Sequence, residues 1–409
     1  MTSRQHIAFL CHPYHRGGVT RWMADAAIAL SLAGHETYFV TIDPVTQFRS
    51  AKGRETMLQL IAREQNKIHI VSTAVGSEFE FGLQEYRIYV YKRLLVRLPM
   101  GTPVILSDDP AVWAAAAELH DCYPVVGVMH SDDGYYYGLA EKYFREVDVF
   151  ACVSNRISSN IRKRIPGFNN ENVLTIPCGI NLPDAEENIS DGNILQLIYV
   201  GRISDVAKRV GDLLKIAEQL ARTNVRFHLD IIGDGDARVV LEDKFAKSDV
   251  HEYVTFTGWQ SKDKVTDYLC EADILLLTSD FEGTPIAMME AFAAGCGVVG
   301  TRVSGIEDYE HDPMAADCLS VYSVGDIDDA VGKILQLAGV PKNMRRKAAR
   351  KLAEEEFSME VCLKKYLNAI SVLKARSAEP PIIKMSPLTI IYSNIRATAR
   401  GLRLRFSRK

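Results

Sequence analysis

Short apolar runs alternate with helix-like segments along most of the chain, and this alternation limits the possible folds more than any other feature. In the first half the runs read HIAFLCH, ETYFVTI, PVILS, YPVVGVMH and DVFACVS, and in the second half LQLIYVG, FHLDIIG, YVTFTG, ADILLLTS and CGVVGT. Strands that are apolar on both faces are typical of parallel sheets covered by helices on each side. The sequence therefore predicts an α/β protein with two doubly wound, Rossmann-like parallel sheets.

The length of the chain indicates more than one domain. Its 409 residues exceed what a single hydrophobic core usually serves. The polar stretch NLPDAEENISDGN (181–193) contains Pro, Gly and Asn without periodicity, and it is the best linker candidate. We therefore expect a first domain over residues 1–185 and a second over residues 190–356. In such domains ligands bind at the carboxyl ends of the strands, here in the cleft between the two domains.

Composition and charge exclude several classes of protein. The net charge of −4 argues against nucleic acid as the main partner, and the apolar run Ile7–Cys11 is too short for the core of a signal peptide. No apolar stretch reaches the 18 residues expected of a transmembrane helix. The eight cysteines are scattered without a Cys-x-x-Cys spacing, which favours buried, reduced thiols over disulfides or a metal site. These features predict a cytoplasmic globular protein.

A glutamate on the apolar side of a predicted helix is the first candidate for ligand binding. In DFEGTPIAMMEAFAAG (280–295), Thr284 suits the N-cap and Gly295 the C′ position. Pro285 suits the first helical position, so a helix from Pro285 to Ala294 is predicted. Glu290 shares one face of this helix with three apolar residues, Ile286, Met289 and Ala293.

The position of Glu290 raises the question of what satisfies its charge. A buried carboxylate costs several kcal/mol unless it is paired or hydrogen-bonded. Either a protein cation or the hydroxyls of a ligand must meet this need. The free N–H groups at the start of the same helix form a natural anion site. Glu290, in the second turn of the helix, is placed to accept both hydroxyls of a ribose whose phosphates lie at that helix start.

Two cations follow the first strand of the second half. In YVGRISDVAKRVGDLL (199–214), a strand ends at Gly201, Arg202 follows at once, and Lys208 stands where the next helix is expected to begin. Two cations at the carboxyl end of a strand, beside a glycine that permits close approach, suit a diphosphate. A solvated basic loop is the alternative, and Arg209 is the rival of Lys208.

Glycines after two other strands give weaker signals. Gly17 and Gly18 form a turn between the first strand and the first helix, and its backbone amides can reach a phosphate. Gly233 and Gly235 follow the strand FHLDII, but the third glycine of a dinucleotide-binding loop is missing. A dinucleotide fold is therefore not indicated.

Taken together, these residues resemble the large family of retaining GT-B glycosyltransferases with two glutamates in the spacing E-x7-E, also called glycosyltransferase family 4 or group 1. Its members assemble bacterial polysaccharides and glycolipids. The resemblance covers most of the chain and is strongest in YVGRISDVAKRVGDLL, FHLDIIGDG and the long stretch from YVTFTGWQ to TRVSGI. It is looser in GGVTRW, VVGVMHSDD, DVFACVSNRISSNI and VLTIPCGIN, as is usual for acceptor-binding halves.

The resemblance implies a role for each matching residue. Glu290 holds the donor ribose, and Arg202 and Lys208 neutralise the diphosphate, which Gly18 approaches from the other domain. Glu282 meets the sugar hydroxyls and the diphosphate together with the backbone of Gly283, Thr284, Pro285 and Ile286. The family histidine near the anomeric carbon matches His130. Catalytic roles then fall to His130, Glu282, Arg202 and Lys208, and donor binding also involves Gly17, Gly201 and Gly233.

The resemblance also implies the domain roles and the reaction. Residues 1–185 bind the acceptor, a saccharide or lipid-linked saccharide, and residues 190–356 bind the donor, a UDP- or GDP-sugar. Residues 357–373 form a helix that crosses back to the first domain. No cofactor or metal is expected, because cations and helix termini stabilise the leaving diphosphate. Retention follows from attack on the face that the nucleotide leaves.

Three alternatives stay open at this point. A metal-dependent GT-A transferase needs an Asp-x-Asp motif, which Asp234–Asp236 and Asp326–Asp328 provide, but it leaves the second α/β half unexplained. A GT-B epimerase or phosphorylase would use the same residues on a sugar nucleotide. A catalytically inactive sugar-nucleotide-binding protein would keep the donor site alone.

The last 36 residues differ in charge from the rest of the chain. Residues 374–409 contain nine Lys or Arg and one Glu, a net charge of +8, which leaves −12 on the remainder. From Ser386 on, an apolar helical stripe is flanked by arginines, a pattern typical of helices that lie in a membrane interface. We expect residues 386–409 to contact an anionic membrane, with packing on the acidic body or disorder as alternatives. The stripe comprises Leu388, Ile391, Tyr392, Ile395, Ala399, Leu402 and Phe406.

Overall fold

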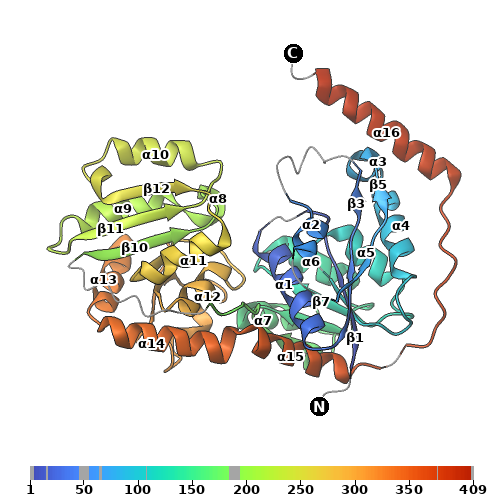
Figure 1. The fold of residues 1–409 in the computed structure, drawn as a ribbon, viewed down its shortest axis with the longest axis horizontal. Coiled ribbons are helices and arrows are strands. Elements are labelled where there is room, and N and C mark those ends of the chain that lie inside the picture. The colour runs from blue at the N-terminus through green and yellow to red at the C-terminus, as the bar shows by residue number, and fades with distance from the viewer. Residues whose placement is uncertain are drawn as a thin grey trace.

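Two α/β domains lie side by side in the computed structural model, each with one large parallel sheet between layers of helices (Figure 1). The structure describes residues 4–14, 17–45, 55–63, 67–106, 108–183, 194–374 and 376–406, with the backbone alone for residues 401–406. Neighbouring strands of both sheets pair in parallel. The predicted fold class is confirmed.

The N-terminal domain is built on a seven-stranded sheet in the order β4-β2-β1-β6-β7-β8-β9. Its strands are β1 (His6–Leu10), β2 (Glu36–Val40), β4 (His69–Val71), β6 (Val104–Leu106), β7 (Val125–Met129), β8 (Val149–Cys152) and β9 (Val173–Thr175). Its helices are α1 (Gly18–Leu32), α2 (Met57–Ala62), α3 (Ser77–Phe81), α4 (Gln84–Leu95), α5 (Pro110–Ala117), α6 (Gly134–Tyr143) and α7 (Asn155–Arg164). A small second sheet pairs β3 (Asp43–Pro44) with β5 (Ala74–Val75).

The C-terminal domain is built on a six-stranded sheet in the order β12-β11-β10-β13-β14-β15. Its strands are β10 (Leu195–Val200), β11 (Phe227–Ile232), β12 (Val254–Gly258), β13 (Ile274–Leu277), β14 (Gly297–Thr301) and β15 (Leu319–Tyr322). Its helices are α8 (Asp205–Lys208), α9 (Gly211–Leu220), α10 (Arg238–Ala246), α11 (Lys262–Glu271), α12 (Ile286–Ala293) and α13 (Ile327–Ala338). The strand order reverses between β10 and β13, the position where doubly wound sheets bind ligands.

The strands that border the cleft are buried throughout, as their composition requires. Every residue of β7 (VVGVM) and of β13 (ILLL) is buried. Side-chain caps fix the turns that follow two strands of the N-terminal domain. Asp133 accepts a hydrogen bond from the Tyr135 amide at 2.8 Å to begin α6, and Ser154 accepts one from the Ile157 amide at 3.2 Å to begin α7. These turns hold the carboxyl ends of β7 and β8 at the cleft.

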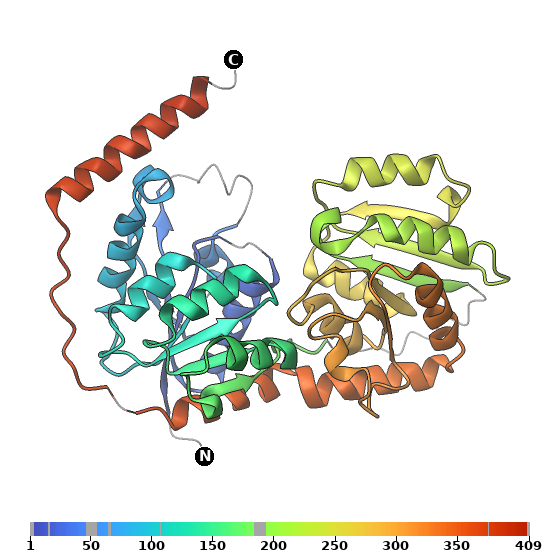
Figure 2. The ribbon, with the colours of Figure 1, turned by 180° about the vertical axis from the view of Figure 1, so that it is seen from behind.

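A continuous helical ridge joins the two domains along one side (Figures 1 and 2). It consists of α14 (Lys342–Leu352), a π-helical turn (Ala353–Phe357) and α15 (Met359–Ser371). The Ile180 amide donates to the Phe357 carbonyl at 2.8 Å, and the Met359 amide donates to the Ile180 carbonyl at 2.9 Å. The chain therefore returns to the N-terminal domain next to where it leaves. The linker predicted at 181–193 lies outside the described residues from position 184 on.

Two local predictions about helix ends are wrong. Thr284 does not cap α12, because its hydroxyl donates to the Val153 carbonyl at 2.5 Å and Pro285 takes the cap position. Lys208 does not begin a helix but ends α8, and Arg209 breaks the helical path with a φ of 44°. Gly295, with a φ of 80°, follows α12 in the left-handed conformation predicted for it.

Candidate functional site

The loop after β13 enters the N-terminal domain and forms the floor of the cleft. The Asp132 amide donates to the Glu282 carbonyl at 3.2 Å, and the Thr284 hydroxyl reaches the end of β8. A Cβ atom on Gly283 would lie 1.9 Å from the His130 carbonyl oxygen. Only glycine fits at this position, so the carboxyl edges of the two sheets meet directly at Gly283.

The N-termini of two helices face each other beside this floor. α1 begins at Gly18 and α12 begins at Ile286. A Cβ atom on Gly18 would lie 2.8 Å from Cγ1 of Ile286. Each helix start carries unsatisfied N–H groups and the positive end of a dipole. The juxtaposition creates an environment of positive electrostatic potential with one half on each domain.

Glu290 is the carboxylate of this environment. Burial raises the pKa of Glu290, nearby Lys262 and Arg21 act to lower it, and Asp25 acts to raise it. Within the described ranges, no ion pair of Glu290 is formed. The two cations pair with Asp25 instead, Arg21 at 2.8 Å and Lys262 at 3.4 Å. Glu290 is therefore a largely buried carboxylate whose hydrogen-bonding capacity stays open.

Lys208 and Glu282 form an ion pair in the same cleft. The Lys208 ammonium contacts Oε1 of Glu282, and the Ser279 hydroxyl donates to the same oxygen at 2.6 Å. The backbone of Lys208 is held as well, since the Thr278 hydroxyl donates to its carbonyl at 2.6 Å. Lys208 of α8 and Glu282 of the loop after β13, both predicted from the sequence as site residues, thus lie in contact.

Arg209, the alternative to Lys208, forms ion pairs with two other carboxylates. Its Nε lies 2.8 Å from a carboxylate oxygen of Asp212, and its Nη1 lies 3.4 Å from Asp280. The side chain of Arg202, by contrast, is exposed. Its backbone is fixed, because the Tyr199 hydroxyl donates to the Arg202 carbonyl at 2.7 Å. Of these three cations, Arg202 is the exposed one, whereas Lys208 and Arg209 each pair with a carboxylate.

The glycines predicted near the donor have different structural surroundings. Gly233 adopts a φ of 141°, and a Cβ atom on it would lie 1.9 Å from the Gly201 carbonyl oxygen. The loops after β10 and β11 thus pack backbone to backbone through these two glycines. Gly17 has a φ of 134° and caps α1, with open space around it.

His130 lies at the end of β7 as a buried, neutral imidazole. Burial lowers its pKa to about 3. Its ring meets the edge of Trp22, with centroids 5.4 Å apart, and Nδ1 lies 3.7 Å from Sγ of Cys178. Nε2 is buried without a hydrogen-bond partner among the described residues. A buried polar atom left in this state can receive a ligand group.

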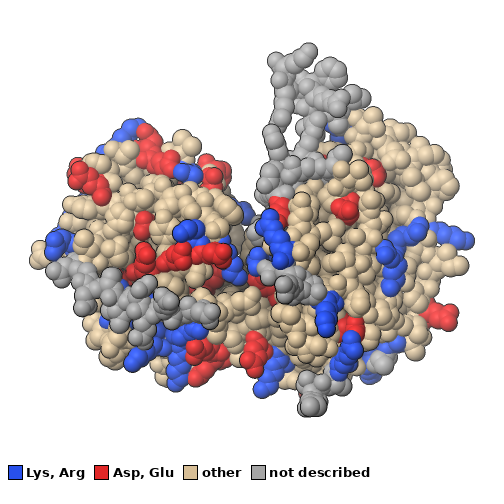
Figure 3. Space-filling view, viewed as in Figure 1, with Lys and Arg blue, Asp and Glu red and all other residues tan. Residues whose placement is uncertain are grey.

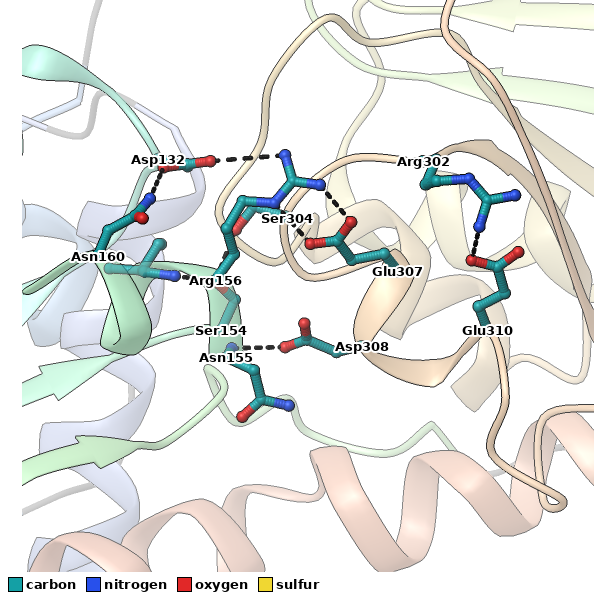
Figure 4. A network of polar contacts seen from close by, with 11 residues as sticks. Asp132, Ser154, Asn155, Arg156, Asn160, Arg302, Ser304, Glu307, Asp308 and Glu310 are labelled. Carbon is teal, nitrogen blue, oxygen red and sulfur yellow. Dashed lines mark hydrogen bonds and ion pairs between the residues drawn. The ribbon is translucent and has the colours of Figure 1, made fainter. Parts of the chain in front are cut away.

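A second contact between the domains was not predicted from the sequence (Figure 4). Arg156 Nε donates to Glu307 at 2.5 Å, with a second bond from the same guanidinium, and its Nη1 lies 3.7 Å from Asp132. The Asn155 amide donates to Asp308 at 2.7 Å, next to a 2.6 Å contact between the hydroxyls of Ser154 and Ser304. The segments SNRI and VSGIED carry no local signal for this pairing.

The two Asp-x-Asp motifs serve local structure. Asp326 caps α13 by accepting from the Asp329 amide at 3.0 Å, and Asp328 accepts from the Gln219 side chain at 2.7 Å. Asp234 accepts from the Gly235 amide at 2.8 Å. In the part of the chain that the structure describes, no group of three His, Cys, Asp or Glu residues is arranged to hold a metal ion.

The two domains face each other across a hollow that is bordered by Lys, Arg, Asp and Glu side chains (Figure 3). Two facing domains whose parallel sheets direct their carboxyl edges to such a charged cleft define the GT-B class. Comparison with protein families gives the assignment within that class: residues 16–183 match Glycosyltransferase Family 4, and residues 195–339 match Glycosyl transferases group 1. The chain belongs to this family of GT-B glycosyltransferases, as its sequence motifs indicated.

Individual relatives agree with this assignment. The chain is 34% identical over 125 residues to the amylovoran biosynthesis glycosyltransferase AmsK of Erwinia amylovora, with 29% of this chain and 30% of that protein covered. It is 33% identical over 141 residues to the lipopolysaccharide 1,6-galactosyltransferase of Salmonella typhimurium, with 34% and 38% covered. The chain therefore spans well under half the length of these curated relatives.

Solved structures share the whole fold at low identity. A TarM mutant of S. aureus, in complex with fondaparinux, α-GlcNAc-glycerol and UDP, has a TM-score of 0.69 at 14% identity and covers 90% of this chain and 99% of its own. HepE of Anabaena in complex with UDP has a TM-score of 0.68 at 13% identity, with 90% and 100% covered. At these identities the likeness establishes the fold.

Proposed function

We propose that the protein is a retaining, metal-independent glycosyltransferase that moves a sugar from a nucleotide-diphosphate sugar to an acceptor hydroxyl, in the assembly of a polysaccharide or glycolipid. The observation that carries this proposal is Glu290. It is a largely buried carboxylate without an ion pair among the described residues, and its helix starts opposite the start of α1. A ribose diphosphate fits both features, because its hydroxyls donate to a carboxylate and its phosphates prefer helix N-termini.

The donor is a UDP- or GDP-sugar bound mainly by the C-terminal domain. Glu290 accepts from the ribose hydroxyls, while the amides at Gly18 and Ile286 approach the diphosphate. Arg202, which is exposed just after the end of β10, supplies a positive charge to the diphosphate. UDP in the solved structures of TarM and HepE supports a uridine donor over a guanosine donor.

Departure of the diphosphate is assisted by charge already in place. Negative charge develops on the leaving phosphate, and fixed cations and helix termini stabilise such charge without reorganisation. Lys208, which contacts Glu282, supplies one of these cations to the leaving phosphate. Glu282 then accepts from a hydroxyl of the sugar, so both members of the ion pair gain a ligand partner.

His130 acts next to the anomeric carbon as a neutral group. A pKa of about 3 keeps the imidazole uncharged at physiological pH, and Nε2 is the nitrogen that is left to contact the sugar or the acceptor. The acceptor hydroxyl attacks on the face that the nucleotide leaves, and the leaving phosphate takes its proton. The anomeric configuration is thereby retained.

The protein acts in the cytoplasm, at the inner face of a membrane where lipid-linked saccharides are available as acceptors. Seven of its eight cysteines are buried, which suits reduced thiols in a reducing compartment. Across the described ranges, every helix is too short or too polar to cross a bilayer. Attachment of the basic tail, residues 386–409, would be peripheral.

A thermal-shift screen with UDP, GDP, ADP and CMP tests the donor site. A nucleotide at 100 times its dissociation constant stabilises a protein by about 2.7 kcal/mol. UDP or GDP should raise the melting temperature of the full chain, and Glu290→Ala should abolish the rise. An Asp267→Asn variant is the control, because Asp267 pairs with Lys264 on the exposed side of α11. The absence of a shift with every nucleotide would contradict the donor site.

Turnover measurements test the reaction class. With the sugar nucleotide chosen by the screen, transfer should persist in EDTA, and the product should keep the anomeric configuration of the donor by NMR. Loss of activity in EDTA that manganese restores would refute metal independence. Release of free sugar phosphate, or epimerisation without transfer, would favour the phosphorylase or the epimerase.

A further inference from the structure

We propose that helix α16 (Pro387–Phe406) is a membrane-binding surface that fixes the orientation of the N-terminal domain on an anionic bilayer. The helix packs on α3 and α4 of that domain and projects beyond it (Figures 1 and 2). Its start is where the sequence places it, since the Ser386 hydroxyl oxygen accepts from the Thr389 amide at 3.3 Å. The face on which the helix docks, however, is not the apolar one.

Small residues hold α16 against the body of the protein. Ser393 is fully buried, and its hydroxyl oxygen accepts from the Leu83 amide at 3.2 Å. A Cβ atom on Gly82 would lie 2.0 Å from this oxygen, so the helix approaches the chain between α3 and α4 very closely. Ala397, one turn further on, is 5% exposed. The helix is thus docked through Ser393 and Ala397.

The apolar stripe lies on the opposite side of α16 and faces solvent. Its described large members are between 52% and 68% exposed, and they share one face by the i, i+3, i+4, i+7 rule: Leu388, Ile391, Tyr392 and Ile395. Four large apolar side chains in one exposed row indicate a surface that another body covers. The stripe is therefore not needed to hold the helix to its own domain.

The charge around the stripe selects an anionic bilayer as that body. Residues 387–406 contain no Asp or Glu. Arg396 is exposed beside the stripe, one turn after Tyr392, and the exposed Arg400 follows it one turn later. A second copy of the chain would bring two such cationic helices together, whereas anionic headgroups attract both arginines while the stripe enters the acyl boundary. An amphipathic helix with arginines at the edge of its apolar face suits the bilayer interface.

The preceding segment ties the tail to the N-terminal domain. The Arg376 guanidinium lies 2.5 Å from a carboxylate oxygen of Asp148, and the Arg376 carbonyl oxygen would lie 3.2 Å from a Cβ atom on Gly101. Because α16 is then anchored both before and along its length, a bilayer bound to the stripe holds the N-terminal domain in one orientation. That a lipid-linked acceptor is delivered to this domain rests on the proposed function; the membrane contact itself does not.

Vesicle co-sedimentation of the full chain tests the surface. Vesicles of equal parts phosphatidylglycerol and phosphatidylcholine should retain the protein at low salt, and phosphatidylcholine vesicles should retain at least tenfold less. The double variant Ile391→Ser/Ile395→Ser should lose binding at least tenfold. Its control is Val239→Ser/Val240→Ser on α10, which replaces two exposed apolar residues of the other domain.

The outcomes separate this surface from the alternatives. Equal vesicle binding by the Ile391→Ser/Ile395→Ser variant and the parent chain would overturn the proposal, as would no binding by either. Concentration-dependent dimerisation in light scattering that this variant abolishes, without vesicle binding, would identify a second copy as the partner. The shift of melting temperature with UDP should be the same in variant and parent, so failure of the membrane surface is distinguishable from failure of the donor site.

Discussion

Lys262 and Asp25 meet across the cleft, with Nζ of the lysine 3.4 Å from Oδ2 of the aspartate, although they are 237 positions apart. Lys262 begins α11 of the C-terminal domain, and Asp25 lies on α1 of the N-terminal domain. Asp25 also binds Arg21 at 2.8 Å. Asp25 thus pairs with Lys262 and Arg21, the two cations whose charges act to lower the pKa of Glu290.

Asp25→Asn should weaken donor binding, although Asp25 itself does not contact the donor. Once the aspartate charge is removed, Lys262 and Arg21 are free to pair with Glu290 and to compete with the ligand. A charge-assisted hydrogen bond contributes about 1.5–3 kcal/mol, so the donor KM should rise about tenfold or more while kcat changes less. Steady-state kinetics measure the split. The control is Asp267→Asn on the exposed side of α11, which should leave both constants unchanged. A lower melting temperature with an unchanged donor KM would show that Asp25 is only structural.

Glu290→Gln should stabilise the donor-free protein at neutral pH and weaken donor binding. Burial raises the pKa of Glu290 above its ordinary value of 4.5, so the folded state keeps the proton that the unfolded state loses. Stability therefore falls as the pH rises through this window, and the neutral amide avoids the loss. The gain in melting temperature should be present at pH 7.5 and vanish below pH 4.5. A lower melting temperature at pH 7.5, with unchanged affinity for the nucleotide, would mean that Glu290 serves a structural partner.

Substitutions of Lys208 and Arg202 should differ in their effect on stability but should reduce catalysis to the same extent. Lys208→Met leaves the Glu282 carboxylate without its cation, which costs about 1–3 kcal/mol of unfolding free energy. Arg202→Met changes an exposed side chain and should alter stability by about 0.5 kcal/mol or less. Each should reduce kcat about 100-fold, because each removes a cation from the leaving diphosphate. Full turnover in either variant would remove that residue from the catalytic group.

Those elements whose signals are local could be predicted from the sequence. The run ILLL predicts the buried strand β13, and Ser386 before Pro387 predicts the start of α16. Long-range pairs could not be predicted, because a contact such as Arg156 with Glu307 joins residues 151 positions apart and leaves no periodic pattern. Thr284 shows how tertiary structure overrides a local rule, since the Val153 carbonyl takes the hydroxyl that would have capped α12.

His130 should make the stability of the protein sensitive to mild acid. Its pKa is about 3 in the folded state and 6.5 ordinarily, so between these values the unfolded state binds one more proton. Stability therefore falls as the pH drops below 6.5, by up to about 1.4 kcal/mol per pH unit. Between pH 6.5 and 4.5, the melting temperature should fall more steeply with decreasing pH for the parent chain than for His130→Gln. The variant should bind UDP normally but transfer sugar slowly. An equal pH dependence of the melting temperature in the two proteins would contradict the buried, neutral imidazole.

Gly18→Ala should separate helix stability from closure of the cleft. Alanine favours a helix over glycine by about 1 kcal/mol, so the substitution at the first residue of α1 should not lower the melting temperature. Its Cβ atom, however, would lie 2.8 Å from Cγ1 of Ile286 across the cleft, closer than carbon atoms approach. We expect the domains to move apart rather than the Ile286 side chain to rotate, so affinity for the donor nucleotide should fall about tenfold, a change of 1.4 kcal/mol. Ile286→Ala removes the obstructing atom, so the double variant Gly18→Ala/Ile286→Ala should bind the nucleotide more tightly than Gly18→Ala alone.

Small-angle scattering with UDP should report a larger radius of gyration for Gly18→Ala than for the double variant. Equal radii and equal affinities in the two would show that the contact between Gly18 and Ile286 does not govern closure.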